Sequence, residues 1–560
     1  MKFKPTSRSL LALAALLLGA CGDDGGPTGD DPEGFNLRIE TAYLVQTAQT
    51  RGGTVPLVAD RDAYVRVFAL SNDSLKDAAP QVRVRLYHGT EEVAVYDLPA
   101  RSPFVPQRVD QENAVTSWNT KVPGELIQPG LRLLVEVDPD DEIAEVSDSD
   151  NCYPAGCTPL DITVHEMPPL RLTIVPVHQT STGLRGRVTS TNLERFLTLL
   201  RKLYPISELE VTLRAPYTTN TPPLNTEGTI WERIVAELEA VRQVEAGDPV
   251  YYYGVVNPPY NGGGVVGIAN DIPSRTALGW DRFPDAPETM AHELGHNFGR
   301  RHAPCGDAGG ADPQYPYLQG FVGVYGMDVE TAEIKAPFSF TDIMGYCEAS
   351  WWISDYTFQA VLNYRLQNDG PPSSTSRSSL LVWGRIEDDG IVLEPAFQVD
   401  GPGSMPAPRG DYRVEGLDAA GNSLFSYAFA PTTVSDGRPG ARNFALRLPV
   451  DGDVADRLAT LRVTGEGRSA SVSANPVEPS ESRLRVPDAR PPLRRVDAET
   501  VELSWDADRN PMVMVRDPAT GEVLAFARGG RARVSSRAAE LELSYSDGLR
   551  SATQRVPVGR

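Results

Sequence analysis

Three histidines within eleven residues constrain this chain more than any other feature. The chain has six histidines, and His292, His296 and His302 fall in the segment HELGHNFGRRH. On a helix, residues four apart lie on one face about one turn from each other. Two neutral imidazoles at this spacing can bind one Zn²⁺ ion. The segment therefore predicts a helix with a metal-binding face.

The residues around these histidines extend the prediction. Glu293 is rotated by about 100° from His292 on a helix, so it can lie beside a metal-bound water without becoming a ligand. Gly299 allows the helix to end in a left-handed turn that would return His302 as a third ligand. The fourth position would stay open for water, as in a catalytic zinc site. The alternative is a buried helix whose histidines make structural hydrogen bonds.

The segment resembles the metzincin zinc endopeptidases, whose signature HExxHxxGxxH is followed by a Met-turn. The Met-turn has its counterpart in Asp342-Ile343-Met344-Gly345-Tyr346. The resemblance implies that Met344 lies beneath the three imidazoles and that Glu293 is the general base. Asp342 stands where serine is common in that family, so we expect the groups around the ligands to differ here.

The branch of the family stays open. Tyr346 matches astacins and serralysins, in which such a tyrosine can bind zinc and then stabilise the oxyanion. For Tyr346 the alternative is a packed aromatic ring. The helix instead resembles reprolysins, gametolysins and mucin-cleaving enterobacterial metzincins. In every branch the implied activity is zinc-dependent endopeptidase, with a substrate peptide adding antiparallel to an edge strand in residues 262–270.

The rest of the chain predicts a multidomain protein in which an α/β metzincin-like catalytic domain is flanked by all-β Ig-like sandwiches. Residues 168–370 alternate strands with helical patterns at 192–204, 229–244, 288–299 and 354–366, which is typical of an α/β domain. Short alternating runs separated by turns predict sandwiches at 36–165, 379–475 and 484–560. Beyond residue 378 we find no helical pattern and no convergent polar cluster.

The N-terminus predicts an export signal. Residues 1–20 combine Lys2, Lys4 and Arg8 with an apolar run too short to span a bilayer. They end at Cys21 in a sequence that resembles a bacterial lipobox, which implies lipid on Cys21. Residues 21–35 form an acidic tether. We therefore expect a lipid-anchored protein of the bacterial envelope, on the periplasmic or cell-surface face; an ordinary secretory signal is the alternative.

Cysteine spacing favours disulfides. With Cys21 lipidated, four cysteines remain, and these allow three pairings. Cys152 and Cys157 enclose a tight turn and pair most naturally, which leaves Cys305 with Cys347. Reduced thiols are the alternative, although they are not expected beyond a lipobox.

Composition limits the partners. The net charge is −22, and no basic run offsets it, so nucleic-acid binding is excluded. The acidic segment 137–152 and the aspartates Asp307 and Asp312 could bind structural Ca²⁺, but without EF-hand spacing a polar loop is the favoured interpretation. Protein or glycoprotein substrates and the membrane remain as partners. Two rivals are a surface adhesin or glycan-binding lipoprotein with a non-catalytic metzincin-like domain, and a structural envelope lipoprotein.

Overall fold

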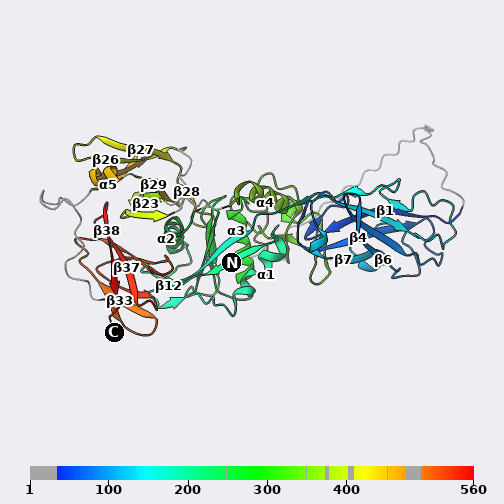
Figure 1. Cartoon of the computed structure of the whole chain (residues 1–560), viewed down its shortest axis with the longest axis horizontal. Coiled ribbons are helices and arrows are strands. Elements are labelled where there is room, and N and C mark those ends of the chain that lie inside the picture. The colour runs from blue at the N-terminus through cyan, green and yellow to red at the C-terminus, as the bar shows by residue number, and fades with distance from the viewer. Residues whose placement is uncertain are drawn as a thin grey trace, which may run out of the picture.

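The protein is elongated in the computed structural model, with β-rich regions at both ends and the main helices between them (Figure 1). The structure describes residues 34–247, 249–347, 350–371, 377–401, 409–450, 452–473 and 493–559. The expected signal segment, Cys21 and the expected boundary near 476–483 lie outside these ranges. No helix in the described part is long and apolar enough to cross a membrane.

The expected fold class is wrong. Strands account for 40% of the protein and helices for 14%, and the described strands form ten separate sheets. The chain is therefore a mostly-β multidomain protein rather than one organised around an α/β metzincin-like domain. The expectation failed because strand–helix alternation in one segment is a local pattern, whereas the fold class depends on all the sheets of the chain.

Two antiparallel sheets in the N-terminal region share one core. Along their strands alternate residues are buried, as Val82, Val84 and Leu86 illustrate, because successive side chains point to opposite faces. The first sheet contains β1 (Leu37–Val45), β4 (Ala63–Ser71) and β7 (Trp118–Val122). The second contains β10 (Leu160–Asp161), β8 (Leu131–Val137), β5 (Val82–His88) and β6 (Glu91–Leu98), with β9 (Cys152–Tyr153) beside β8.

Short strands complete this region and join it to the centre. Trp352 of the central region donates its indole N–H to the carbonyl of Thr47 at 2.8 Å, which reinforces the pairing of β2 with β19. The strands are β2 (Ala48–Gln49) with β19 (Tyr325–Asp328) and β20 (Glu333–Lys335), β3 (Leu57–Val58) with β11 (Val164–His165), and β21 (Thr341–Asp342) with β22 (Trp351–Trp352).

A seven-stranded mixed sheet forms the centre of the molecule. Strands β14, β12, β16 and β18 run parallel, whereas β17 pairs antiparallel with β18 and ends the sheet. The outer edge of β17 lies beside the candidate site. The strands are β12 (Leu170–Gln179), β13 (Leu184–Arg185), β14 (Leu209–Leu213), β15 (Tyr217–Thr219), β16 (Tyr251–Val256), β17 (Gly267–Ala269) and β18 (Thr276–Trp280).

Helices cover both faces of the central sheet. Tyr251 and Tyr253 of β16 share a core with one set of helices, while Tyr252 between them belongs to the core around α2. The first set is α1 (Leu193–Leu203), α3 (Ala286–Asn297) and α4 (Asp355–Asn368). Helix α2 (Thr229–Glu245) is buried between the central sheet and the C-terminal sheets.

Four sheets make up the C-terminal region, and two pairs of them share cores. In the first pair, one sheet contains β24 (Gly390–Leu393), β23 (Arg377–Glu387), β29 (Arg442–Pro449), β28 (Thr432–Thr433) and β25 (Phe397–Gly401). Its partner sheet contains β27 (Ser423–Phe429), β26 (Tyr412–Leu417), β30 (Thr460–Gly465) and β31 (Arg468–Ser473). In the second pair, one sheet contains β32 (Arg494–Arg495), β33 (Thr500–Ser504) and β36 (Arg531–Ser535). Its partner sheet contains β35 (Val523–Arg528), β34 (Met512–Arg516), β37 (Glu540–Ser546) and β38 (Ser551–Pro557). A short helix, α5 (Gly452–Arg457), corrects the expectation of no helix there.

Charged pairs dock the C-terminal sheets on α2. Glu237 of α2 contacts Arg528 at 3.1 Å, and Glu245 contacts Arg214 of the central region at 2.6 Å while accepting the backbone N–H of Val523 at 2.5 Å. Buried ion pairs of this kind are costly to break. They hold the C-terminal region in one position relative to the candidate site.

Candidate metal centre

Helix α3 carries two of the predicted ligands and ends where the third requires it. His292 and His296 are buried on this helix, and His296 is fully buried. Gly299 follows in a left-handed conformation, with φ 85°, and its N–H donates to the carbonyl of His296 at 2.8 Å. Glycine adopts this conformation at no steric cost. The turn brings His302 back to the two helical histidines, as the spacing predicted.

The three imidazoles converge through their Nε2 atoms. The Nε2 of His296 lies 3.2 Å from that of His292 and 3.1 Å from that of His302. Each Nδ1 lies 2.5–2.8 Å from a backbone carbonyl oxygen. The carbonyl of Ile343 faces His292, that of Arg300 faces His296, and that of Gly309 faces His302.

This arrangement fits a metal ion. A carbonyl oxygen only accepts hydrogen bonds, so each ring must carry its proton on Nδ1 and present a lone pair at Nε2. Lone pairs this close cannot bond one another, whereas a tetrahedral Zn²⁺ with bonds of 2.0–2.1 Å would separate its nitrogen ligands by about 3.3 Å. Carbonyls that orient histidine ligands in this way are a regular part of metal sites.

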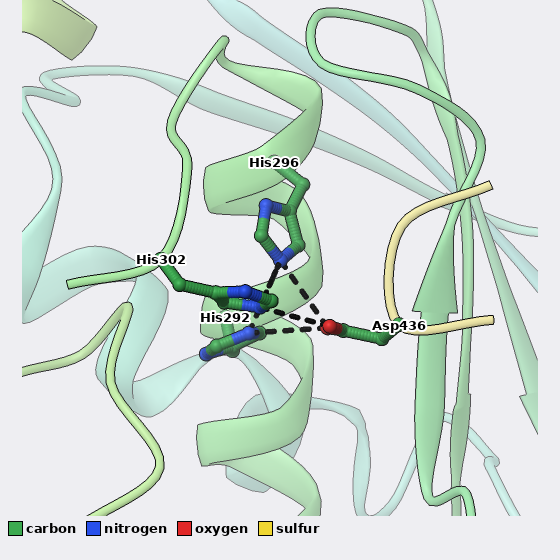
Figure 2. A group of neighbouring side chains, drawn as sticks. All are labelled: His292, His296, His302 and Asp436. Carbon is green, nitrogen blue, oxygen red and sulfur yellow. Dashed lines mark hydrogen bonds and ion pairs between the residues drawn. The ribbon is translucent and has the colours of Figure 1, made fainter. Parts of the chain in front are cut away.

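A fourth donor comes from the C-terminal region. Asp436 follows β28, and its carboxylate oxygens lie 3.2 Å from Nε2 of both His292 and His296 and 2.8 Å from that of His302. The four donor atoms all lie within 4.8 Å of one another. Figure 2 shows Asp436 facing the three rings from a separate loop, opposite α3.

Asp436 corrects two expectations. A polar group from beyond residue 378 does converge on the site, and the fourth position is taken by a side chain. Asp436 lies 140 residues after His296, in a Ser-Asp-Gly sequence that is common in turns. No local pattern separates this aspartate from the other turn aspartates of the chain, so sequence reasoning missed it.

The charges of the site are coupled. Without a metal ion, and although burial opposes it, imidazoles that carry a proton at Nε2 would hold the pKa of Asp436 well below its usual range. Burial lowers the pKa of His296, while in the same metal-free state a hydrogen bond to Asp436 would outweigh burial and raise the pKa of His302. A carboxylate facing neutral imidazole lone pairs is favoured when a cation lies between them.

Glu293 lies beside the metal group without joining it. Its side chain is buried, and its Oε2 has no hydrogen-bond partner among the described residues. Burial raises the pKa of Glu293 well above the usual value, and the Asp436 carboxylate raises it further. A Cβ at Gly267 of β17 would collide with this carboxylate, so glycine at that edge makes room for it. Glu293 also lines a pocket of about 600 Å³.

The segment 342–346, which resembles a Met-turn, packs against α3. Met344 is buried, and a Cβ at Gly295 of α3 would collide with its sulfur. Asp342, where the sequence departs from the family pattern, is fully buried and accepts the N–H of Met344 at 2.9 Å. Its other oxygen accepts the N–H and hydroxyl of Ser354 at 2.9 and 2.5 Å. Asp342 therefore fastens the Met-turn to the start of α4.

Tyr346 faces the site but is bound to Asp436. Its ring centroid lies 4.8 Å from that of His302 and 5.5 Å from that of His292. The hydroxyl donates to Oδ1 of Asp436, and the side chain is 45% exposed. The ring is therefore not simply packed in the core, while its predicted role at the metal stays a prediction.

Both expected disulfides are present. Cys152 pairs with Cys157, with Cα atoms 5.2 Å apart, and Cys305 pairs with Cys347 at 5.3 Å. The second joins the segment after His302 to the segment after the Met-turn.

The acidic segments considered for calcium have other contacts. Asp138 accepts the N–H groups of Glu142 and Ile143 within its own loop. Asp312 contacts Arg300 at 3.3 Å and Tyr356 at 2.9 Å. In the described part of the chain, the histidine–aspartate group is the only set of three or more converging metal-binding side chains, so calcium remains a sequence-based prediction.

Comparisons with known proteins add little to this geometry. No protein-family model and no curated protein matches the chain. Among solved structures, an archaemetzincin from Methanopyrus kandleri is 19% identical over 35% of this chain and 96% of its own, with a TM-score of 0.19. A CARDB domain of the PF1109 protein from Pyrococcus furiosus, solved in complex with di-metal ions, is 14% identical over 24% and 94%, with a TM-score of 0.15.

A β-glucuronidase from Parabacteroides merdae is 10% identical over 93% of this chain and 78% of its own, with a TM-score of 0.15. TM-scores this low support no conclusion about the fold or activity of this chain. Its own side chains give the firmer statement: the protein contains a buried His-His-His-Asp group suited to a metal ion.

Proposed function

We propose that the chain is a zinc-dependent endopeptidase that hydrolyses peptide bonds of extracellular or envelope proteins. One observation carries the proposal: three oriented Nε2 lone pairs converge beside Glu293, a buried carboxylate whose Oε2 has no partner among the described residues. A carboxyl group left unpaired in a buried site is costly. Such a cost is typical of groups that act on a substrate.

Zinc is the metal that suits this donor set. Three imidazoles with one further position form the usual catalytic zinc site, and nitrogen and oxygen donors in tetrahedral array favour this ion. Bound there, zinc would supply Lewis acidity and lower the pKa of water toward about 7.

The side chains of the chain supply the proton transfers. We infer that Glu293 accepts a proton from the attacking water at Oε2 and passes it to the leaving amine. Its burial favours this role, because a base with a raised pKa holds the proton long enough to deliver it. The outer edge of β17, where it is not paired with another segment, would offer main-chain hydrogen bonds to an extended peptide, which gives register with little sequence selectivity.

One observation favours a second candidate. Structural zinc sites are closed by four protein ligands, and Asp436 lies where it could be the fourth. A surface adhesin or glycan-binding lipoprotein with a non-catalytic metal site would have such a closed centre. The buried Glu293, whose Oε2 has no partner among the described residues, argues against it, because a structural site gains nothing from that group.

We also propose, from the N-terminal sequence, that lipid on Cys21 anchors the chain in the bacterial envelope. A Cys21→Ser variant should move from the membrane fraction to the soluble fraction, with the double variant Cys152→Ser/Cys157→Ser as the control for loss of other cysteines. Equal membrane association of the Cys21→Ser variant would contradict lipid anchoring.

Peptide-library cleavage by the zinc-loaded chain tests the enzyme proposal. The measurement is made on wild type and on a chain lacking the Asp436 carboxylate, so that an occupied fourth position does not hide activity. Glu293→Gln should keep its zinc and lower kcat/KM by about a thousandfold, while Glu227→Gln, an exposed glutamate near the same pocket, should change it little. Near-normal cleavage by Glu293→Gln, or no cleavage by any zinc-loaded chain, would refute the proposal.

A further inference from the structure

The loop that carries Asp436 also lies along the free edge of the central sheet. The N–H of Ser435 donates to the carbonyl of Ala269 at 2.8 Å, and the N–H of Ala269 donates to the carbonyl of Ser435 at 3.3 Å. The two residues form an antiparallel bridge. Since β17 pairs with β18 on its other side, the loop takes the edge to which an extended substrate would add.

The backbone of the loop turns the carboxylate toward the histidines. Asp436 has φ 61°, a left-handed conformation that aspartate tolerates better than most residues. Its two oxygens contact all three imidazoles, and one of them also accepts the hydroxyl of Tyr346. The loop therefore occupies both parts of the site, the strand edge and the fourth metal position.

Two anchors that follow Asp436 in the chain hold the loop in place. Arg438 contacts the carboxylate of Glu232 at the start of α2 through Nη2 at 2.8 Å and Nε at 3.1 Å. The backbone N–H of Arg438 donates to the same carboxylate at 2.8 Å. Further along, Asn443 of β29 donates to Asn270, the residue after β17, at 2.6 Å. Both anchors join the C-terminal region to the central region next to the site.

We propose that the chain is latent in this state, because the loop 434–438 of its own C-terminal region fills the substrate edge and places Asp436 in the fourth metal position. This regulation rests on the proposed function. The site opens when the loop leaves β17. Pro439 and Gly440, just beyond the arginine anchor, are exposed, so a nick or a partner protein can reach the loop there.

The proposal predicts a measurable difference in access to the site. A ligand that needs the fourth position binds only the fraction of molecules in which the loop has left, so its apparent affinity falls by that fraction. The site is closed by the contact of Asp436 with the imidazoles and by the bridge of Ser435 to Ala269. Removing the Asp436 carboxylate abolishes the first of these. Because glycine adopts the left-handed conformation freely, Asp436→Gly removes the carboxylate without straining the turn.

The test uses the full chain loaded with zinc and two readouts that do not depend on cleavage. The first is binding of a fluorescent dipeptide hydroxamate, which needs the fourth position of the metal. The second is zinc affinity, measured by competition with a chelator. Relative to wild type, Asp436→Gly should bind the hydroxamate at least about tenfold more tightly and zinc at least about tenfold more weakly.

Two further variants control the result. Asp411→Ala removes an exposed aspartate of the same C-terminal region and should change neither readout. Arg438→Ala leaves the carboxylate in place but cuts the anchor to Glu232, and it should also tighten hydroxamate binding. This variant decides the question if Asp436→Gly fails to fold.

The outcomes separate latency from the enzyme proposal. Tighter hydroxamate binding without any peptide cleavage supports the closing loop and overturns the endopeptidase. Weaker zinc binding with unchanged hydroxamate binding overturns latency, since Asp436 would then be a structural ligand. Equal hydroxamate binding and equal cleavage by wild type and Asp436→Gly overturn latency and leave the endopeptidase in place.

Discussion

The candidate metal centre has a local side and a remote side. The local side is His292, His296 and His302, which come from α3 and its exit. The remote side is Asp436, which arrives from a loop of the C-terminal sheets (Figure 2). The local side is built from the geometry of one helix and one glycine turn, whereas the remote side depends on how two regions dock.

The difference shows that the two sides are stabilised in different ways. His296 and His302 are oriented by carbonyls of their own segment, and His292 by the carbonyl of Ile343, so all three orienting carbonyls belong to the central region. Asp436 stays in place through one bridge to β17 and the contact of Arg438 with Glu232. We therefore expect the local side to withstand changes that displace the remote side.

Breaking the local side should have the largest effect. His296 is fully buried and contacts both other rings through Nε2, so His296→Ala removes a central ligand. Zinc should fall from one per chain to a small fraction in metal analysis after dialysis, and cleavage should be lost with it. His178→Ala, elsewhere in the central region, should retain zinc. Stoichiometric, tightly held zinc in the His296→Ala variant would overturn the ligand assignment.

The two disulfides offer a second test of the local side. Cys305–Cys347 closes 42 residues around the site and Cys152–Cys157 closes 5 residues in the N-terminal region. On the chain-entropy model, replacing each pair by alanine should cost about 4 and about 2 kcal/mol respectively. Urea unfolding followed by tryptophan fluorescence measures both. The Cys305–Cys347 disulfide would have no special bearing on the site if both variants lost the same free energy of unfolding, or if the Cys152/Cys157 variant lost its zinc.

Sequence reasoning predicted the local side and missed the remote one for a physical reason. Helical spacing and a glycine turn determine the relative positions of His292, His296 and His302, and both signals are readable over eleven residues. The position of Asp436 depends on the docking of β sheets through side chains such as Arg528 and Glu237, which carry no local pattern.

The same limit explains the fold class. The four helical patterns of the central region each have a helix in the structure. The proportion of strand to helix in the whole chain was misjudged because strand pairing is non-local. The ten sheets contain far more residues than the few helices. The buried role of Asp342 was also not predictable from the sequence, since its partner Ser354 caps the next helix.

Tyr346 connects the two sides, so removing its hydroxyl sharpens the comparison. In the chain without the Asp436 carboxylate, Tyr346→Phe should lower kcat by about a hundredfold, because one hydrogen-bond donor to a developing oxyanion contributes about 3 kcal/mol. Zinc content and Tm should change little.

The matched control for that hydroxyl is Tyr317→Phe. Tyr317 also donates a hydroxyl to a carboxylate, that of Asp355 at 2.7 Å, but away from the metal group. Its loss should leave kcat unchanged. A fall in kcat of less than about threefold for Tyr346→Phe would favour a packing role for the ring.

The smallest expected effect concerns the pocket that residues of both sides line. Glu288 of α3 lines this pocket with Glu293, His292 and Asp436. Burial, together with the nearby Asp285 carboxylate, raises the pKa of Glu288 to about 8. In the unfolded chain a glutamate titrates near about 4.3, so between these values the folded state holds more protons and its stability must fall as pH rises.

Glu288→Gln removes this titrating proton, so the stability of the variant should fall less steeply as the pH rises. Its Tm should match wild type near pH 4.5 and exceed it by roughly 2–4 °C above pH 8, which is about the shift that 1 kcal/mol produces in a region of this size. Glu194→Gln, on the exposed face of α1, should follow wild type at every pH. If Glu288→Gln also follows wild type throughout, water fills the pocket beside the metal centre in solution, and burial does not raise the pKa of Glu288.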